Sequence, residues 1–363
     1  MPDIRLEGIT KRFGGQVAVD NLSMTFAEGT VTCLLGPSGC GKTTLMRMIA
    51  GLETPTAGQI LFGDRDVTQL PPRRRNIGMV FQYPVMYPTL TVRENIALPL
   101  ENNASLGEAE RRKRIDEVLQ ILQLAPLAGR YIDQLDAGTR QKVAVARAVA
   151  RQTDIILFDE PTTNVEVTSK LLLVRAFKEV AQRMRQTIVY VTHDQTEAMT
   201  LADQIALMRD GKIVQCDGPR ELYNRPTTEF GGWFLGSPGM NFITAKVSNG
   251  RIDAPLFPAP IAAPAGLPDG EVTLGLRPEA LRLHAAPGPA TVPVEVESVS
   301  ITIGGRYLFR LGIGGISVKV KRAGGDGFGE GLARGGTAHL ECPPAMIAFF
   351  SQGKRLGAEG QSV

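Results

Sequence analysis

The sequence lacks the long apolar runs that cross membranes. Nowhere in its 363 residues does an uninterrupted apolar run approach about 18 residues, so no transmembrane helix is expected. The first residues, Met1 to Arg5, have neither the charged start nor the apolar core of a secretory signal peptide. We therefore expect a cytoplasmic protein, and any role at a membrane must come through a partner.

Cysteine is scarce, and charge of one sign does not accumulate. The four cysteines are widely spread and form no C-x-x-C motif: Cys33, Cys40, Cys216 and Cys342. They predict free thiols in a reducing compartment rather than a disulfide framework or a zinc site. The formal net charge of +3 is mixed in sign and forms no concentrated basic stripe, so no nucleic-acid partner is expected.

What the sequence does contain is a glycine-rich stretch between two apolar runs. Residues 36–44 read Gly-Pro-Ser-Gly-Cys-Gly-Lys-Thr-Thr and match the P-loop pattern G-x-x-x-x-G-K-[ST] without a mismatch. Val31–Leu35 predicts a buried strand before it, and Leu45–Ala50 predicts a helix after it. The residues expected to bind a nucleotide are Gly36, Pro37, Ser38, Gly39, Cys40, Gly41, Lys42, Thr43 and Thr44.

The chemistry of this stretch suits a nucleoside triphosphate. Glycine-rich backbone curls closely enough around a phosphate to aim successive N–H groups at it, and the helix N-terminus adds partial positive charge. Lys42 would reach the β- and γ-phosphates, and the Thr43 hydroxyl would bind Mg²⁺. The alternative interpretation is a glycine-rich turn with no ligand.

A second motif, which is acidic, follows a predicted buried strand at residues 155–158. Ligands bind at the carboxyl ends of strands in open α/β sheets, where Asp159 and Glu160 stand. Asp159 would hold the Mg²⁺ of the nucleotide, and Glu160 would orient and deprotonate an attacking water. His193 ends another buried strand, where a γ-phosphate would lie, and we favour a catalytic role over a structural one.

Patterns elsewhere divide the chain into an α/β part and an all-β part. Residues 89–150 are helical in pattern, with apolar residues on one face of the segment 108–124, and predict a helical subdomain within an ATP-binding domain of residues 1–235. Residues 236–363 are rich in glycine and proline, with short strand-like runs, and predict a small β-barrel. The Pro-rich residues 254–268 predict a surface connection, and the basic run Pro71–Arg75 predicts a solvated loop rather than an anion site.

As an ordered set, these motifs resemble the ATPase subunit of ATP-binding-cassette importers, over residues 3–235. The set also includes Gln82, in Val-Phe-Gln, and the helical insert. Further segments resemble the maltose and glycerol-phosphate type of these importers: Leu70–Gln82, Tyr87–Pro88, Gly236–Phe242 and Gly275–Glu279. The resemblance implies a RecA-like P-loop NTPase core with a helical subdomain, followed by an oligomer-binding-type (OB-like) β-barrel used in dimer contact and regulation.

The resemblance also implies partners and further site residues. Two ATPase subunits would close head to tail around two ATP molecules, each touching the P-loop of one subunit and the signature loop of the other. Phe13 would stack on adenine, and Gln82 would link the γ-phosphate and metal to the membrane subunits. Two permease subunits and a solute-binding protein would complete an importer at the cytoplasmic side of the inner membrane.

The signature loop departs from the family pattern. Leu-Ser-Gly-Gly-Gln is replaced by residues 135–139, Leu-Asp-Ala-Gly-Thr, which place Asp136 and Gly138 toward the partner's ATP. A carboxylate at about 4 Å from a phosphate charge repels it by roughly 4 kcal/mol at an effective dielectric of 20. Asp136 also suits a helix N-cap, and the two interpretations are compatible. The loop at residues 163–166 departs as well, with Glu166 where the family has aspartate.

Because the chain's own nucleotide-holding residues match the family while its signature does not, we hypothesise a heterodimer with a second ATPase that has an intact signature. The solute is guessed from the subfamily alone as a polyol, glycerol, glycerol-phosphate or sugar. A spermidine-, iron- or sulfate-type importer, a homodimeric sugar-importer ATPase, a soluble cassette ATPase acting on DNA or ribosomes, and a catalytically silent regulatory partner are the alternatives.

Overall fold

The computed structural model describes residues 2–101, 106–151, 153–163, 165–184, 186–302, 305–323, 332 and 334–357. The chain forms two compact units that divide between Leu222 and Tyr223. This division lies earlier than the boundary after residue 235 that the sequence predicts. The reason is that Arg277 of the second unit donates hydrogen bonds to the carbonyls of Tyr223, Gly232 and Leu235, which hold this segment in that unit.

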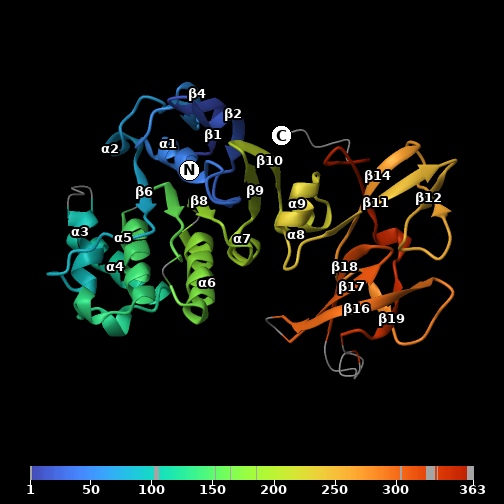
Figure 1. Ribbon diagram of the computed structural model, residues 1–363. Helices are drawn as coiled ribbons and strands as arrows, with labels where there is room; N and C mark the ends of the chain where they lie inside the picture. The colour runs from blue at the N-terminus through green and yellow to red at the C-terminus, as the bar shows by residue number, and fades with distance from the viewer. Residues whose placement is uncertain are drawn as a thin grey trace. The chain divides into compact units, whose positions relative to one another are not determined.

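The first unit is built around a six-stranded sheet with the order β10-β9-β3-β8-β7-β6 (Figure 1). Its strands are β3 (Val31–Leu35), β6 (Ile77–Val80), β7 (Ile155–Asp159), β8 (Thr187–Thr192), β9 (Gln204–Arg209) and β10 (Lys212–Asp217). Strand β3 is parallel to β8 and β9, β8 to β7, and β7 to β6, whereas β10 returns antiparallel. Every residue of β3 and β8 is buried, as expected for strands covered on both faces.

The strand register sets where the loops of this sheet emerge. Leu35 pairs with Thr192, Asp159 with Val191, and Val80 with Phe158. Because β3, β8, β7 and β6 all run in the same direction, their carboxyl ends lie at one edge of the sheet. The segments of this chain that the sequence predicts to face the phosphates of a nucleotide all begin at that edge.

A second, antiparallel sheet has the order β2-β1-β4-β5. It consists of β1 (Ile4–Phe13), β2 (Gln16–Phe26), β4 (Ala57–Phe62) and β5 (Arg65–Asp66). Helix α1 (Lys42–Ala50) packs against β2, β7 and β8, and one hydrophobic core joins residues of both sheets to the helix. The P-loop helix is therefore held between the two sheets by apolar burial.

The predicted helical subdomain contains α3 (Val92–Glu101), α4 (Glu108–Ile121) and α5 (Ala137–Ala150), which pack against one another (Figure 1). The apolar face expected in α4 and just beyond it is buried: Ile115, Val118, Leu119 and Leu122. Helices α6 (Val167–Met184) and α7 (Gln195–Leu201) follow β7 and β8. Among the described residues, no helix has the length and apolar character needed to span a membrane.

The second unit carries α9 (Glu229–Phe234) and two antiparallel sheets, with the orders β13-β12-β11-β14-β20-β21 and β15-β19-β16-β17-β18, while α8 (Pro219–Asn224) crosses the division. Its longer strands are β11 (Asn241–Ser248), β14 (Gly270–Leu276), β16 (Thr291–Ile301), β17 (Tyr307–Ile313), β18 (Ile316–Arg322) and β19 (Thr337–Glu341). Its short strands are β12 (Arg251–Asp253), β13 (Ile261–Ala262), β15 (Arg282–His284), β20 (Ala348–Ser351) and β21 (Lys354–Arg355).

Residues 254–268 form a connection that lies mostly at the surface, as predicted, but part of it packs into the second unit. Leu256 is completely buried in the core of the second unit, and Ile261 pairs with Ile252 as part of β13. The sequence did not predict the burial of these side chains, because a Pro-rich segment without regular periodicity can still bury single apolar side chains. Within the glycine-rich stretch at 323–336, residues 324–331 and 333 lie outside the described residues.

The prediction of a solvated basic loop at residues 71–75 is wrong for Arg75. Residues Pro72–Arg75 form the short helix α2, and the Arg75 side chain is buried. Its guanidinium donates to the carbonyls of Met48 and Ile49 at the end of α1, at 2.7 and 2.8 Å. It also donates to the carbonyls of Leu70 and Thr68, at 2.8 and 3.0 Å. Arg75 therefore caps the C-terminus of the P-loop helix.

We expect Arg75→Ala to lower the free energy of unfolding by about 2–4 kcal/mol, because it leaves several buried carbonyls without a donor. Chemical denaturation of the purified chain measures the change. The matched control is Arg73→Ala, two residues away on the same basic run but exposed, which should change stability by less than about 0.5 kcal/mol. Equal effects of the two substitutions would contradict the capping role.

Candidate active site

The P-loop joins β3 to α1 and requires glycine at defined positions. Gly39 and Gly41 have φ values of +79° and +104°, in the region that residues with a Cβ rarely adopt. A Cβ on Gly41 would lie 2.3 Å from the Ala18 carbonyl oxygen, and one on Gly36 would lie 2.2 Å from that of Met208. The curled backbone that the motif predicts is therefore packed tightly against neighbouring strands.

Lys42 lies within this curl. Its side chain is only 4% exposed, and its ammonium donates to the carbonyls of Gly36 and Pro37, both at 2.9 Å. A positive charge is thus fixed inside the loop where the motif expects phosphates. The nearby Cys40 thiol is also buried, and burial raises its pKa, although the Lys42 charge and hydrogen bonds oppose the shift.

The two predicted magnesium ligands are brought together across the edge of the sheet. Thr43 Oγ1 donates to Asp159 Oδ1 at 3.3 Å. Burial raises the pKa of Asp159, while the hydrogen bond from Thr43 opposes the shift. Within the described residues, no group of three or more His, Cys, Asp or Glu side chains could hold a metal by itself. One hydroxyl and one carboxylate fit Mg²⁺, which takes most of its other ligands from water and phosphate oxygens.

Glu160 and His193 meet at the same edge. Glu160 Oε2 lies 3.0 Å from His193 Nδ1 and accepts a hydrogen bond from the Thr163 hydroxyl at 3.2 Å. The backbone of Glu160 has a φ of +44°, which is unusual for a residue with a Cβ and turns the side chain out of the strand direction. Its N–H donates to the Val191 carbonyl at 3.0 Å, which fixes this turn against β8.

Gln82 and Phe13 are placed by other elements of the first unit. Gln82 is half-buried in the segment that follows β6, whose carboxyl end is beside that of β7. Phe13 ends β1, is 49% exposed, and has the Lys11 ammonium 4.9 Å from its ring centroid. Lys11 also pairs with Glu53 at 3.0 Å, so the aromatic face stands beside a fixed cation.

Asp136 and Gly138 lie at the start of α5, in the helical subdomain, apart from the P-loop and α1 (Figure 1). Asp136 is the N-cap of α5: it accepts hydrogen bonds from the Thr139 backbone N–H at 2.8 Å and the Thr139 hydroxyl at 2.6 Å. These bonds lower the pKa of Asp136, so its carboxylate is charged at neutral pH. The capping interpretation is confirmed, and the negative charge persists alongside it.

Sequence reasoning missed Glu197, which is buried beside this site. The side chain is 2% exposed on α7 and contacts Lys170, Thr162, Tyr190 and Thr192. A glutamate four residues after His193 is no motif by itself, and nothing in the sequence pattern singles it out. Its burial could not be found without the fold.

Comparison with known proteins agrees with this geometry. A family model described as ABC transporter matches residues 19–163, and one described as MalK OB fold domain matches residues 236–281. The sn-glycerol-3-phosphate import ATP-binding protein of Paracoccus denitrificans is 38% identical over 361 residues, which cover 99% of this chain and 94% of that protein. The chain belongs to the ABC transporter ATP-binding proteins.

Two further similarities extend the comparison. The Fe(3+) ions import ATP-binding protein of Haemophilus influenzae is 40% identical over 295 residues, covering 81% of this chain and 89% of that protein. A solved dimeric bacterial ABC transporter cassette is 32% identical, with a TM-score of 0.53, over 60% of this chain and 99% of that one. The ABC family assignment makes the chain an ATPase with a P-loop core and a C-terminal OB-fold domain, as the sequence predicts.

The tight fit of the P-loop predicts different effects for two glycines of this ABC ATPase. Gly41→Ala should lower ATP affinity more than about 10-fold, because the new methyl group meets the Ala18 carbonyl and the backbone is left-handed. Gly39→Ala has the backbone strain but no atom within 4 Å, so its loss should be smaller. Equilibrium binding of a fluorescent ATP analogue compares them, and the reverse order would contradict the packing argument.

Proposed function

We propose that the chain is the ATP-hydrolysing subunit of an importer for a carbohydrate-like solute: a polyol, glycerol, glycerol-phosphate or sugar. The observation that carries the catalytic part is the meeting of Thr43 with Asp159 and of Glu160 with His193 at one edge of the parallel sheet. The solute class is supported by the Paracoccus denitrificans relative, whose name specifies sn-glycerol-3-phosphate import. The Haemophilus influenzae relative favours an Fe(3+) importer as the second candidate.

In this proposal the P-loop and Lys42 bind the phosphates of ATP, and Phe13 stacks on adenine. Thr43, Asp159 and Gln82 bind Mg²⁺, which would neutralise phosphate charge when bound. Glu160 takes a proton from the attacking water, and His193 holds the Glu160 carboxylate from one side and reaches toward the γ-phosphate with its other nitrogen. Burial at the site supports these roles, since Lys42 is buried while the side chains of Glu160 and His193 are 21% and 47% exposed to water.

Uptake measurements test the solute. Deleting the gene should abolish accumulation of labelled glycerol-3-phosphate or a related polyol and leave Fe(3+) uptake unchanged. The opposite pattern would favour the second candidate. Loss of uptake on complementation with Glu160→Gln would exclude a catalytically silent regulatory subunit.

The signature loop supports a heterodimer with a second ATPase. Asp136 is exposed at the start of α5 and remains ionised, because Thr139 stabilises its charged form. Facing the γ-phosphate of a partner's ATP, this charge would oppose closure of the dimer. The chain's own P-loop has no such defect, so it would hydrolyse ATP opposite a subunit with an intact signature. The alternative is a homodimeric sugar-importer ATPase that tolerates the charge.

Asp136 variants separate its charge from its capping role. Asp136→Asn keeps the N-cap and removes the charge, and Asp136→Ser restores the family's hydroxyl while still capping α5. Both should raise ATP turnover of the purified homodimer by about 10-fold or more, because the repulsion at closure is lost. Unchanged turnover in both variants, or a homodimer already as fast as a co-expressed pair of different ATPases, would contradict the heterodimer.

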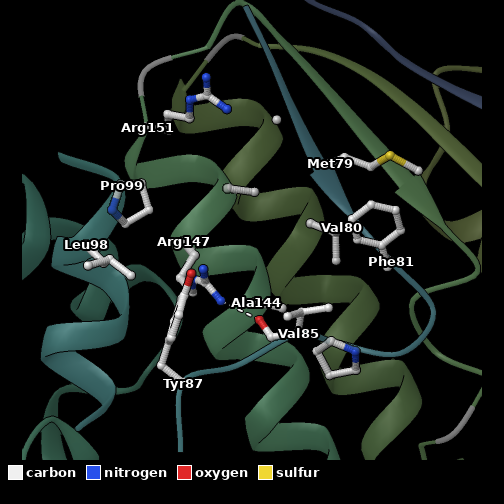
Figure 2. Close-up of a pocket in the computed structure, with 13 residues that line it drawn as sticks. Met79, Val80, Phe81, Val85, Tyr87, Leu98, Pro99, Ala144, Arg147 and Arg151 are labelled. Atoms are coloured by element: carbon white, nitrogen blue, oxygen red, sulfur yellow. Dashed lines mark hydrogen bonds between the residues drawn. The ribbon is translucent and has the colours of Figure 1, made fainter. Parts of the chain in front are cut away.

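A groove beside Gln82 is the proposed docking site for a permease helix. Its volume is about 580 Å³, and it opens between the end of β6, α3 and α5 (Figure 2). Arg147 of α5 donates to the Val85 carbonyl, and its guanidinium lies 5.1 Å from the Tyr87 ring centroid. The side chains of Phe81 and Val85 are 43% and 71% exposed, which leaves apolar surface for a partner. Docking there would hold the ATPase at the cytoplasmic side of the inner membrane.

A charge placed in this groove should uncouple the ATPase from transport. We expect Val85→Asp to reduce co-purification with the permease subunits and solute uptake at least about 10-fold, because a carboxylate is buried against apolar surface. ATP binding by the isolated chain should be retained. Leu52→Asp is the control, since Leu52 is 48% exposed and lies outside the groove. Unaffected co-purification of Val85→Asp would argue against docking at this site.

A further inference from the structure

A buried carboxylate behind the active site joins elements that the catalytic proposal treats separately. Glu197 Oε2 accepts hydrogen bonds from the Tyr190 hydroxyl at 3.0 Å and the Thr192 hydroxyl at 2.7 Å. Its other oxygen accepts from the Thr162 hydroxyl and lies 2.8 Å from the Lys170 ammonium. These donors come from β8, the loop after β7 and α6, so one side chain on α7 connects three other segments.

The contacts on one side of Glu197 fix the turn that carries His193. The Thr192 hydroxyl donates to Glu197 and accepts from the Asp194 backbone N–H at 2.9 Å. Asp194 then caps α7 by accepting from the backbone N–H groups of Thr196 and Glu197, at 2.7 and 3.2 Å. Both neighbours of His193 are therefore held by hydrogen bonds, and one of these bonds is made to Glu197.

The contacts on the other side fix the loop that carries Glu160. The Thr162 hydroxyl is bound to Glu197, and the Thr162 carbonyl accepts from the Val165 N–H at 3.1 Å. The Thr163 N–H donates to the Glu160 carbonyl at 3.3 Å, so hydrogen bonds link Glu160 to Thr163 and Thr162 to Val165. Movement of this loop relative to His193 would lengthen the 3.0 Å contact between Glu160 and His193.

Lys170 balances the charge of this cluster. Its ammonium lies 2.8 Å from both Glu197 Oε1 and Asp194 Oδ2, and its own backbone N–H donates to the Glu166 carbonyl at 2.9 Å. Burial disfavours the charged lysine, but the hydrogen bonds to Asp194 and Glu197 outweigh it and raise the pKa of Lys170. The ion pair therefore ties the start of α6, and with it the loop ending at Glu166, to the turn at His193.

We propose that Glu197 is a positioning residue that holds the Glu160 loop and the His193 turn in one arrangement. Through this shared carboxylate, a shift of the loop at residues 162–166 is passed to His193 and to its contact with Glu160. The inference rests on the proposed roles of Glu160 and His193 in hydrolysis. Glu197 itself lies beneath the site and is given no contact with ATP or water.

A double-mutant cycle tests this role in the full chain, assembled with its partner subunits. Glu197→Gln keeps the side-chain shape but removes the charge that pairs with Lys170 and replaces one accepting oxygen by an NH2 donor, so the present hydrogen bonds cannot all be kept. We expect kcat to fall about 10- to 100-fold, as when reacting groups are misplaced by about 1 Å, with little change in affinity for an ATP analogue. Glu179→Gln is the matched control, because it breaks an exposed ion pair on α6.

The cycle combines Glu197→Gln with His193→Ala. If Glu197 acts through His193, the double variant should be no slower than His193→Ala alone, whereas independent effects would multiply. Multiplying effects, or a loss of kcat matched by an equal loss of ATP affinity, would overturn the proposal. An unchanged kcat in His193→Ala would instead overturn the proposed role of His193, which keeps the two failures distinct.

A second pair of variants keeps the test decisive if Glu197→Gln does not fold. Thr192→Val removes the hydroxyl that joins Glu197 to the His193 turn, and Thr192→Ser retains it. We expect Thr192→Val to lower kcat about 10-fold and to speed amide hydrogen exchange at residues 192–197, with Thr192→Ser close to the unaltered protein. Equal kcat values for the valine and serine variants would contradict the positioning role.

Discussion

The structure depends on the parallel pairing of four buried strands, β3, β8, β7 and β6. Parallel register brings the carboxyl end of each strand to one edge of the sheet, so segments more than a hundred residues apart in the chain emerge side by side. The P-loop follows β3, Asp159 and Glu160 end β7, and His193 follows β8. The buried apolar side chains of these strands therefore determine the geometry of a polar site, although they are not part of the site themselves.

Polar groups at this edge are fixed by contacts beneath the surface as much as by those that face a nucleotide. Arg75 caps the end of α1 through the carbonyls of Met48 and Ile49 and also donates to those of Thr68 and Leu70. Glu197 joins the turns on either side of the Glu160–His193 contact. Both side chains are buried ions whose partners satisfy them, which is the condition for a charge inside a protein. Each therefore restricts an element that bears site residues without belonging to the site.

Asp136 serves local structure, and in the proposed heterodimer its charge would oppose closure on a partner's ATP. As an N-cap it satisfies the first turn of α5, and that same hydrogen bonding keeps its carboxylate ionised. In the proposed heterodimer the charge would act where a second subunit presents a phosphate to α5, so the proposed consequence concerns the choice of partner rather than stability of the fold.

The sequence by itself determined the P-loop, the strand ending at Asp159 and Glu160, the helical insert and the all-β second part, because these depend on local spacing and periodicity. It also predicted the N-cap at Asp136 from residue type alone. Only the tertiary structure decided that Arg75 is buried rather than solvated, that Leu256 belongs to a core, and that Glu197 lies beneath His193. Those outcomes depend on which distant segments cover a side chain, and burial by distant segments leaves no periodic signal in the sequence.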